Sequence, residues 1–217
     1  MSIKNNLLQI KSTLPEQVTL VAVSKTKPVS DLMEAYEASQ RIFGENKIQE
    51  MSEKWEQMPK DIQWHMIGHV QTNKVKFMAQ FVSLIHGVDS LKLLQEINKQ
   101  ALKHNRIIDC LLQIHIAEEE TKFGLDEQEL ASLLSSSEFE EMKNIRIVGL
   151  MGMATFTDNK DQIKKEFSHL KSIFDQLTIH NSQFTILSMG MSGDYQLAIE
   201  CGSNMVRIGS SIFGGRN

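Results

Sequence analysis

A lysine follows directly on the first strongly apolar segment of the chain. Residues 18–24 read VTLVAVS, and Lys25 comes next, with Lys27 and Pro28 just behind it. An amine at the end of a buried strand loses its proton more readily, because burial disfavours the charged form, and it then attacks aldehydes. Lys25 is therefore a candidate for a covalent carbonyl adduct. A solvated loop lysine is the plainer interpretation, and Lys27 is the competing amine.

Two small-residue turns near the end of the sequence are suited to a phosphate group. Ser192 and Gly193 lie in the first turn, SMGMSGD, which leads into the helix-like segment YQLAI. Gly209 and Ser210 lie in the second turn. Backbone N–H groups at the start of a helix, together with a serine hydroxyl, donate hydrogen bonds to an anion. Each turn alone is equally consistent with an ordinary capped loop, but together they predict a two-sided phosphate cup.

Arg207 lies inside the last apolar segment, MVRIG at 205–209. A permanent cation within a strand is costly unless it faces a polar opening or has a partner. Arg207 is therefore either a ligand-facing group at the phosphate cup or one half of a structural ion pair.

The remaining histidines and cysteines do not indicate a metal site. His65 and His69 are four residues apart in a strand-to-loop segment, without the helical spacing and acidic neighbours of zinc enzymes. Cys110 and Cys201 are far apart, and Cys110 stands in an apolar run. We expect a buried, inert thiol there and no bound metal.

Short apolar runs must position these side chains, and helix-like stretches separate the runs. The eight candidate strands are 18–24, 41–45, 62–68, 81–89, 107–116, 145–154, 184–190 and 205–209. The clearest candidate helices are 3–13, 30–40, 90–105 and 161–177, and a Ser-Asp pair typical of a helix N-cap opens the second of these. Alternating strands and helices indicate βαβ units around a parallel sheet.

Eight such units in about 200 residues fit a closed barrel better than an open sheet. The predicted fold class is α/β: a single (β/α)8 TIM-type barrel domain spanning 1–217, with an extra N-terminal helix. In such barrels ligands bind at the carboxyl ends of the strands, and phosphate often lies after strands 7 and 8. Lys25 and both small-residue turns fall at these positions.

The composition excludes several partner classes. The chain has 217 residues, 41% of them hydrophobic, and a formal net charge of -4 with a pI near 6.0. Nucleic acids and anionic membranes favour basic patches, so neither is an expected partner. The N-terminus lacks the apolar block of a signal peptide, and no run is long enough to span a bilayer. We expect a cytoplasmic protein.

Six motifs occur in order along the chain: LVAVSKTKP, FGEN, WHMIGHVQTNK, GLMGMAT, SMGMSGDYQLAI and VRIGSSIFG. In this combination the chain resembles the pyridoxal 5′-phosphate (PLP) homeostasis protein family, from about residue 18 to 215. The resemblance implies the fold of the alanine racemase N-terminal domain and PLP as the cofactor. This sequence departs from the family pattern at Ser210, where many members have threonine, and at Lys47, where many have tyrosine.

The resemblance also implies roles for individual residues. Lys25 is expected to hold PLP as a Schiff base, and Arg207 to face the pyridine nitrogen. The expected phosphate ligands are Ser192, Gly209 and Ser210. Asn46, Met151 and His69 are expected to line the pocket, and Lys122 is a candidate cation at its entrance.

The function implied is to hold PLP and take part in intracellular vitamin B6 homeostasis, without strong catalysis. An arginine at the pyridine nitrogen disfavours a protonated ring and so makes PLP a poorer electron sink. Racemisation needs a second base, and neither Tyr36 nor Tyr195 is obviously placed for that role. The alternatives are a PLP-dependent amino-acid racemase of low activity and a phosphate-sugar barrel enzyme without PLP. PLP-dependent apo-enzymes are possible recipients, and a monomer is expected.

Overall fold

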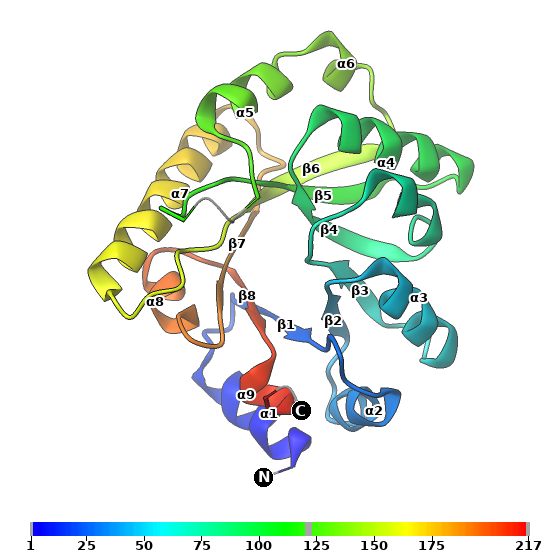
Figure 1. Ribbon diagram of the computed structural model, residues 1–217, viewed down its shortest axis with the longest axis vertical. Helices are drawn as coiled ribbons and strands as arrows, with labels where there is room; N and C mark the ends of the chain where they lie inside the picture. Colours follow the sequence, from blue (N-terminus) through cyan, green and yellow to red (C-terminus); the bar gives the residue numbers. More distant parts are fainter. Residues whose placement is uncertain (1, 120–122, 216–217) are drawn as a thin grey trace.

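Eight parallel strands close into a barrel in the part of the chain that the structure describes. The structure is a computed structural model that describes residues 2–119 and 123–215, and its strands pair in chain order around a closed sheet (Figure 1). They are β1 (Thr19–Val23), β2 (Ile42–Glu45), β3 (Gln63–Met66), β4 (Val82–Val88), β5 (Ile108–Gln113), β6 (Ile145–Met151), β7 (Ile186–Met191) and β8 (Met205–Ile208). The predicted barrel is confirmed, and each strand falls within or one residue beyond its predicted run.

Helices follow the strands and cover the outside of the barrel (Figure 1). They are α1 (Ile3–Thr13), α2 (Val29–Glu37), α3 (Ile48–Gln57), the 3-10 helix η1 (Thr72–Phe77), α4 (Leu91–Lys103), α5 (Glu127–Leu134), α6 (Ser137–Glu140), α7 (Lys160–His180), α8 (Tyr195–Glu200) and α9 (Ser210–Phe213). No helix among these is long and apolar enough to cross a membrane.

The extra N-terminal helix α1 packs beside α9, so the two ends of the described chain meet (Figure 1). The Asn6 side-chain amide donates a hydrogen bond of 3.0 Å to the Ile212 carbonyl. The barrel closes between β8 and β1, where Val21 lies opposite Arg207. This closure brings the end of β1, with Lys25, beside the turn after β8.

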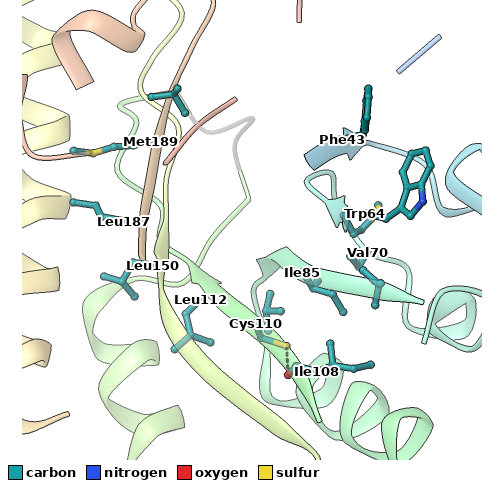
Figure 2. Close-up of a cluster of buried hydrophobic side chains, with 14 of the residues drawn as sticks. Phe43, Trp64, Val70, Ile85, Ile108, Cys110, Leu112, Leu150, Leu187 and Met189 are labelled. Carbon is teal, nitrogen blue, oxygen red and sulfur yellow. Dashed lines mark hydrogen bonds between the residues drawn. The ribbon is translucent and has the colours of Figure 1, made fainter. Parts of the chain in front are cut away.

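The core has two parts, as the alternation of side chains along a strand requires. One set of strand residues, including Leu112, Leu150 and Leu187, packs outward against the helices (Figure 2). The other set fills the barrel interior with residues such as Val21 and Leu111. The strands are apolar on both faces, as expected for a parallel sheet covered by helices.

The prediction for the start of α2 was wrong. The N-cap is Pro28, with φ -69°, and not the Ser-Asp pair, because the helix already begins at Val29. Ser30 and Asp31 therefore lie in its first turn. A proline fixes φ at the value that a helix entry needs, so it can start a helix without a side-chain cap.

Candidate functional site

A cavity of about 440 Å³ opens at the carboxyl ends of the strands. Six of the residues predicted to bind a ligand line it: Lys25, Asn46, Ser192, Arg207, Gly209 and Ser210. A second cavity, of about 360 Å³, lies at the start of β1 and β2 and contains none of the predicted residues. The chemistry predicted from the sequence therefore converges on the cavity at the carboxyl ends.

Lys25 lies in a tight turn whose two neighbours are both held by hydrogen bonds. Thr26 adopts a left-handed conformation with φ 65°, which is strained for a β-branched residue. Its backbone N–H donates to Glu50 Oε1 at 2.5 Å. On the other side, the hydroxyl of the fully buried Ser24 donates to Glu45 Oε1 at 2.6 Å. Hydrogen bonds on both sides of Lys25 therefore fix the backbone there, and with it the direction in which the Lys25 side chain leaves the turn.

Lys54, on α3, links these contacts into one ionic cluster of the buried Glu45 and Lys54 and the half-buried Glu50. The Lys54 ammonium donates to Glu45 Oε1 and Glu50 Oε1, both at 2.7 Å, and to the Ser24 carbonyl at 2.8 Å. Burial raises the pKa of the Glu45 carboxyl, and Lys54 and Ser24 oppose that rise. The sequence showed Glu45 only as part of the FGEN motif; its role beneath the Lys25 turn comes from the structure.

Lys27, the competing amine, also lines the cavity. Its ammonium donates a hydrogen bond of 2.8 Å to the Gly215 carbonyl. Lys27 is thus engaged with the segment after α9, whereas the Lys25 turn is braced from below by the ionic cluster.

The two small-residue turns meet at one place. The Gly209 backbone N–H donates to Ser192 Oγ at 3.2 Å, which leaves the Ser192 hydroxyl hydrogen available to an anion. A Cβ on Gly209 would lie 3.0 Å from the Val23 carbonyl oxygen, so glycine lets this turn approach the end of β1. A Cβ on Gly193 would meet no protein atom within 4 Å, so that side of the turn is open.

Asp194 also lines the cavity, although no sequence pattern selected it as a site residue. Its Oδ1 accepts a hydrogen bond of 2.6 Å from the Met191 backbone N–H, which fixes the carboxyl at the phosphate-side turn. Burial raises the pKa of Asp194, partly offset by that hydrogen bond and by the charge of Arg207. It is a negative group beside an expected anion site.

Arg207 is 3% exposed and points from β8 to the cavity. Its Nη1 donates to Ser188 Oγ at 2.7 Å and its Nη2 to the Gly152 carbonyl at 3.2 Å. Burial lowers its pKa to about 10, and Asp194 opposes that shift. Both of these acceptors are uncharged, so the contacts among the described residues favour a ligand-facing Arg207 over the structural ion pair that was the alternative interpretation.

Two other residues expected to line the pocket lie elsewhere. Met151 is fully buried in the barrel interior and does not line the cavity. Met153, which lies just past the end of β6, does line it. His69 stacks on Phe123, with ring centroids 4.2 Å apart, and lies 3.3 Å from Asp89. Lys122 lies outside the described residues.

His65 lies against a second buried histidine. Its Nδ1 lies 3.0 Å from Nε2 of the fully buried His86. Among the residues described, no group of three or more His, Cys, Asp or Glu side chains is placed to hold a metal ion. Cys110 is fully buried, as expected, and burial raises its pKa.

Comparison with known proteins first identifies the broad family of this chain. The family model "Alanine racemase, N-terminal domain" matches residues 1–217, so the chain belongs to that family. A solved alanine racemase from Clostridium difficile superimposes with a TM-score of 0.82 at 18% identity, covering 99% of this chain and 57% of that one. At this identity the match supports the fold alone.

Closer relatives narrow the class to the PLP homeostasis proteins, the family to which this chain belongs. The pyridoxal phosphate homeostasis protein of Pasteurella multocida is 37% identical, over all of this chain and 99% of the relative. PipY of Synechococcus elongatus PCC7942 is 32% identical and has been solved without and with PLP bound, with TM-scores of 0.91 and 0.89. Both PipY matches cover 98% of this chain and all of PipY. The family resemblance inferred from the six motifs is confirmed.

Proposed function

We propose that this chain binds PLP in the cavity at the carboxyl ends of the strands, holds it as a Schiff base on Lys25, and serves intracellular PLP homeostasis. One observation carries the proposal: the Ser192–Gly209 hydrogen bond joins the two phosphate turns within the cavity that Lys25 and Arg207 also line. The relatives named as PLP homeostasis proteins, and PipY solved with PLP, support it.

The residues present fit this cofactor. PLP supplies an aldehyde, a phosphate and an aromatic ring whose nitrogen accepts or carries a proton. The cavity, at about 440 Å³, is within the usual size for small ligands. It offers an amine, a buried guanidinium and a glycine turn with open space at Gly193.

Each part of the cavity has a distinct task in this proposal. Ser192, with the N–H groups around Gly209 and Ser210, binds the phosphate, and Arg207 donates to the ring nitrogen. Asn46 and Met153 line the space around the ring. The ionic cluster beneath the turn keeps Lys25 directed into the cavity.

We propose further that the chain is a carrier and not a vigorous enzyme. Neither tyrosine offers a second base: the Tyr36 hydroxyl donates to Asp61 at 2.9 Å, and the Tyr195 hydroxyl lies 3.3 Å from Thr13 Oγ1. Neither lines the cavity. A weak amino-acid racemase remains the alternative, because solved alanine racemases share the fold.

Lys25→Ala and Lys27→Ala form the decisive pair of variants. After incubation with PLP and removal of free cofactor, the wild type should absorb at about 420 nm, as lysine adducts of PLP do. This band should disappear in Lys25→Ala and persist in Lys27→Ala. Borohydride reduction followed by peptide mass spectrometry should locate the adduct on Lys25. An unchanged band in Lys25→Ala would reject the assignment.

Assays with single amino-acid enantiomers and chiral product analysis separate the carrier from the racemase. The carrier proposal expects turnover no faster than free PLP gives, and robust racemisation would overturn it. Transfer of PLP to an added PLP-dependent apo-enzyme should exceed the rate of release into buffer. We also propose that the protein is cytoplasmic and monomeric. Light scattering of the purified protein gives its mass in solution and so tests the monomer.

A further inference from the structure

A chain of hydrogen bonds crosses the barrel interior and ends on Arg207. Arg207 Nη1 donates to Ser188 Oγ at 2.7 Å, and Ser188 Oγ lies 3.0 Å from His86 Nδ1. His86 Nε2 in turn lies 3.0 Å from His65 Nδ1. These residues come from β8, β7, β4 and β3, so the chain spans strands that are not neighbours in the sheet. All four side chains are buried.

The direction of donation along this chain is fixed at the Arg207 end. A guanidinium only donates hydrogen bonds, so Ser188 Oγ must accept from it. If His86 also donated to Ser188, the serine hydroxyl hydrogen would have no acceptor among the described contacts of Ser188, which is costly inside a protein. Ser188 therefore donates to His86 Nδ1, and His86, protonated at Nε2, donates to His65 Nδ1.

Both imidazoles are uncharged in this arrangement. Burial lowers the pKa of His65 to about 3, and burial together with the charges of His65 and Arg207 lowers that of His86 well below its usual range. The charged groups that act on the chain are Arg207 itself and Asp194, whose carboxylate interacts with Arg207 from the start of α8. A carboxylate in place of Ser188 would add a second opposing charge to that of Asp194, whereas the neutral Ser188 and His86 add none.

We infer that Ser188, His86 and His65 are positioning residues, an uncharged hydrogen-bond chain that fixes Arg207 and keeps its positive charge directed at the cofactor cavity. The inference rests on the proposed function, since the charge matters only if a PLP ring lies there. It explains why histidine and serine occupy strand positions that an apolar core would fill more cheaply.

The pH titration of the visible band of the PLP-loaded protein tests the inference. A nearby cation lowers the pH at which a basic group on the ligand gains its proton. Ser188→Ala removes the Nη1 acceptor of Arg207, and His86→Leu removes the acceptor that orients the Ser188 hydroxyl. Arg207 is then held less firmly, with the Gly152 carbonyl still accepting from Nη2, so the midpoint of the band should move upward by up to about one pH unit. His86→Asn, whose amide oxygen can still accept from Ser188, should largely restore the wild-type midpoint.

Ser203→Ala is the matched control. Ser203, like Ser188, is a buried serine, and it lies between α8 and β8. Among the described residues, its hydroxyl donates to the carbonyls of Leu187, Met189 and Met205 and not to the histidine chain. Its loss should lower stability without moving the midpoint. If Ser188→Ala and His86→Leu titrate as Ser203→Ala does, the inference is overturned. If the wild type shows no visible band at all, the proposed function fails instead.

A second measurement needs no cofactor and does not depend on the folding of Ser188→Ala or His86→Leu. Nitrogen-15 spectra of the wild type, with histidines assigned by His65→Asn and His86→Asn, report which ring nitrogen carries the proton. We expect His86 protonated at Nε2 only, from pH 8 down to pH 5. A proton on Nδ1 of His86, or a charged imidazole at pH 7, would reverse the chain and refute the inference.

Discussion

Two buried polar groups support the two sides of the cavity, and they are built differently. Beneath Lys25, the ionic cluster of Glu45, Glu50 and Lys54 uses opposite charges within 2.7 Å. Beside Arg207, the contacts to Ser188 and His86 are neutral. The ionic cluster holds a backbone turn, so the charges within the cluster can cancel one another. The neutral chain of Ser188, His86 and His65 holds Arg207, whose positive charge faces the cavity, so the chain must not cancel that charge.

The largest expected effect comes from breaking the ionic cluster. Lys54→Met leaves Glu45 buried and unpaired, and we expect the free energy of unfolding to fall by about 3–5 kcal/mol. The side chains of Lys54 and Glu45 are 6% and 0% exposed, so solvent cannot compensate. Urea denaturation measures the loss.

The double variant Glu45→Gln with Lys54→Met is the control for that prediction. It removes the orphaned charge, and we expect it to recover part of the stability that Lys54→Met loses. A double variant less stable than Lys54→Met alone would show that the ions act through packing and not through charge.

The two groups should also respond to acid with opposite signs. His65 has a pKa lowered to about 3, so between pH 6.5 and 3 the unfolded chain takes up a proton that the folded chain refuses. Stability should therefore fall on acidification by about 1.4 kcal/mol per pH unit for each buried histidine. Glu45, with a raised pKa, takes up its proton first in the folded state and contributes the opposite slope above pH 4.5.

Denaturation curves of the cofactor-free protein between pH 7 and 5 measure this difference. His86→Leu should make the slope shallower by the contribution of one histidine. Glu45→Gln should make it steeper, because the opposing contribution of Glu45 is removed. A wild type whose stability did not change between pH 7 and 5 would contradict the buried neutral state of the histidines.

Relief of the strain in the Lys25 turn should have a smaller effect. Thr26, at φ 65°, is in a conformation that glycine adopts freely, so Thr26→Gly should raise stability by up to about 1 kcal/mol. The same change loosens the turn, so the affinity for PLP should fall. Thermal unfolding and equilibrium dialysis separate the two effects; a gain in both would show that the strain has no role in directing Lys25.

The smallest expected effect concerns Asp194, the carboxylate among the described residues that line the cavity beside Arg207. Asp194→Asn keeps an oxygen to accept from the Met191 N–H and removes a negative charge from the cavity. We expect PLP to bind a few-fold more tightly, with a larger gain at low salt, because like charges repel across the site. Binding measured at two ionic strengths checks this, and an unchanged affinity would show that Asp194 is protonated or screened.

Local sequence patterns predicted much of the fold and about half of the residues discussed at the candidate site. Short apolar runs separated by amphipathic stretches predicted the eight strands, even the marginal run at 41–45. Helices α3 and α5 were not among the named candidates, although α3, with 10 residues, is longer than the predicted α2, with 9. Lys25 and the two small-residue turns were found because each follows a strand directly, where the barrel rule places ligands.

The sequence by itself determined which residues stand at the ends of strands, since strand order and chemistry are both local properties. Only the tertiary structure decided which side chains meet. His65, His86 and Ser188 stand within apolar runs and read as core positions, and Glu45 and Lys54 read as unrelated. Closing the barrel brings β3 and β4 across from β7 and β8, and α3 beneath the β1 turn. Contacts between such distant segments depend on sheet closure and register, which no local pattern encodes.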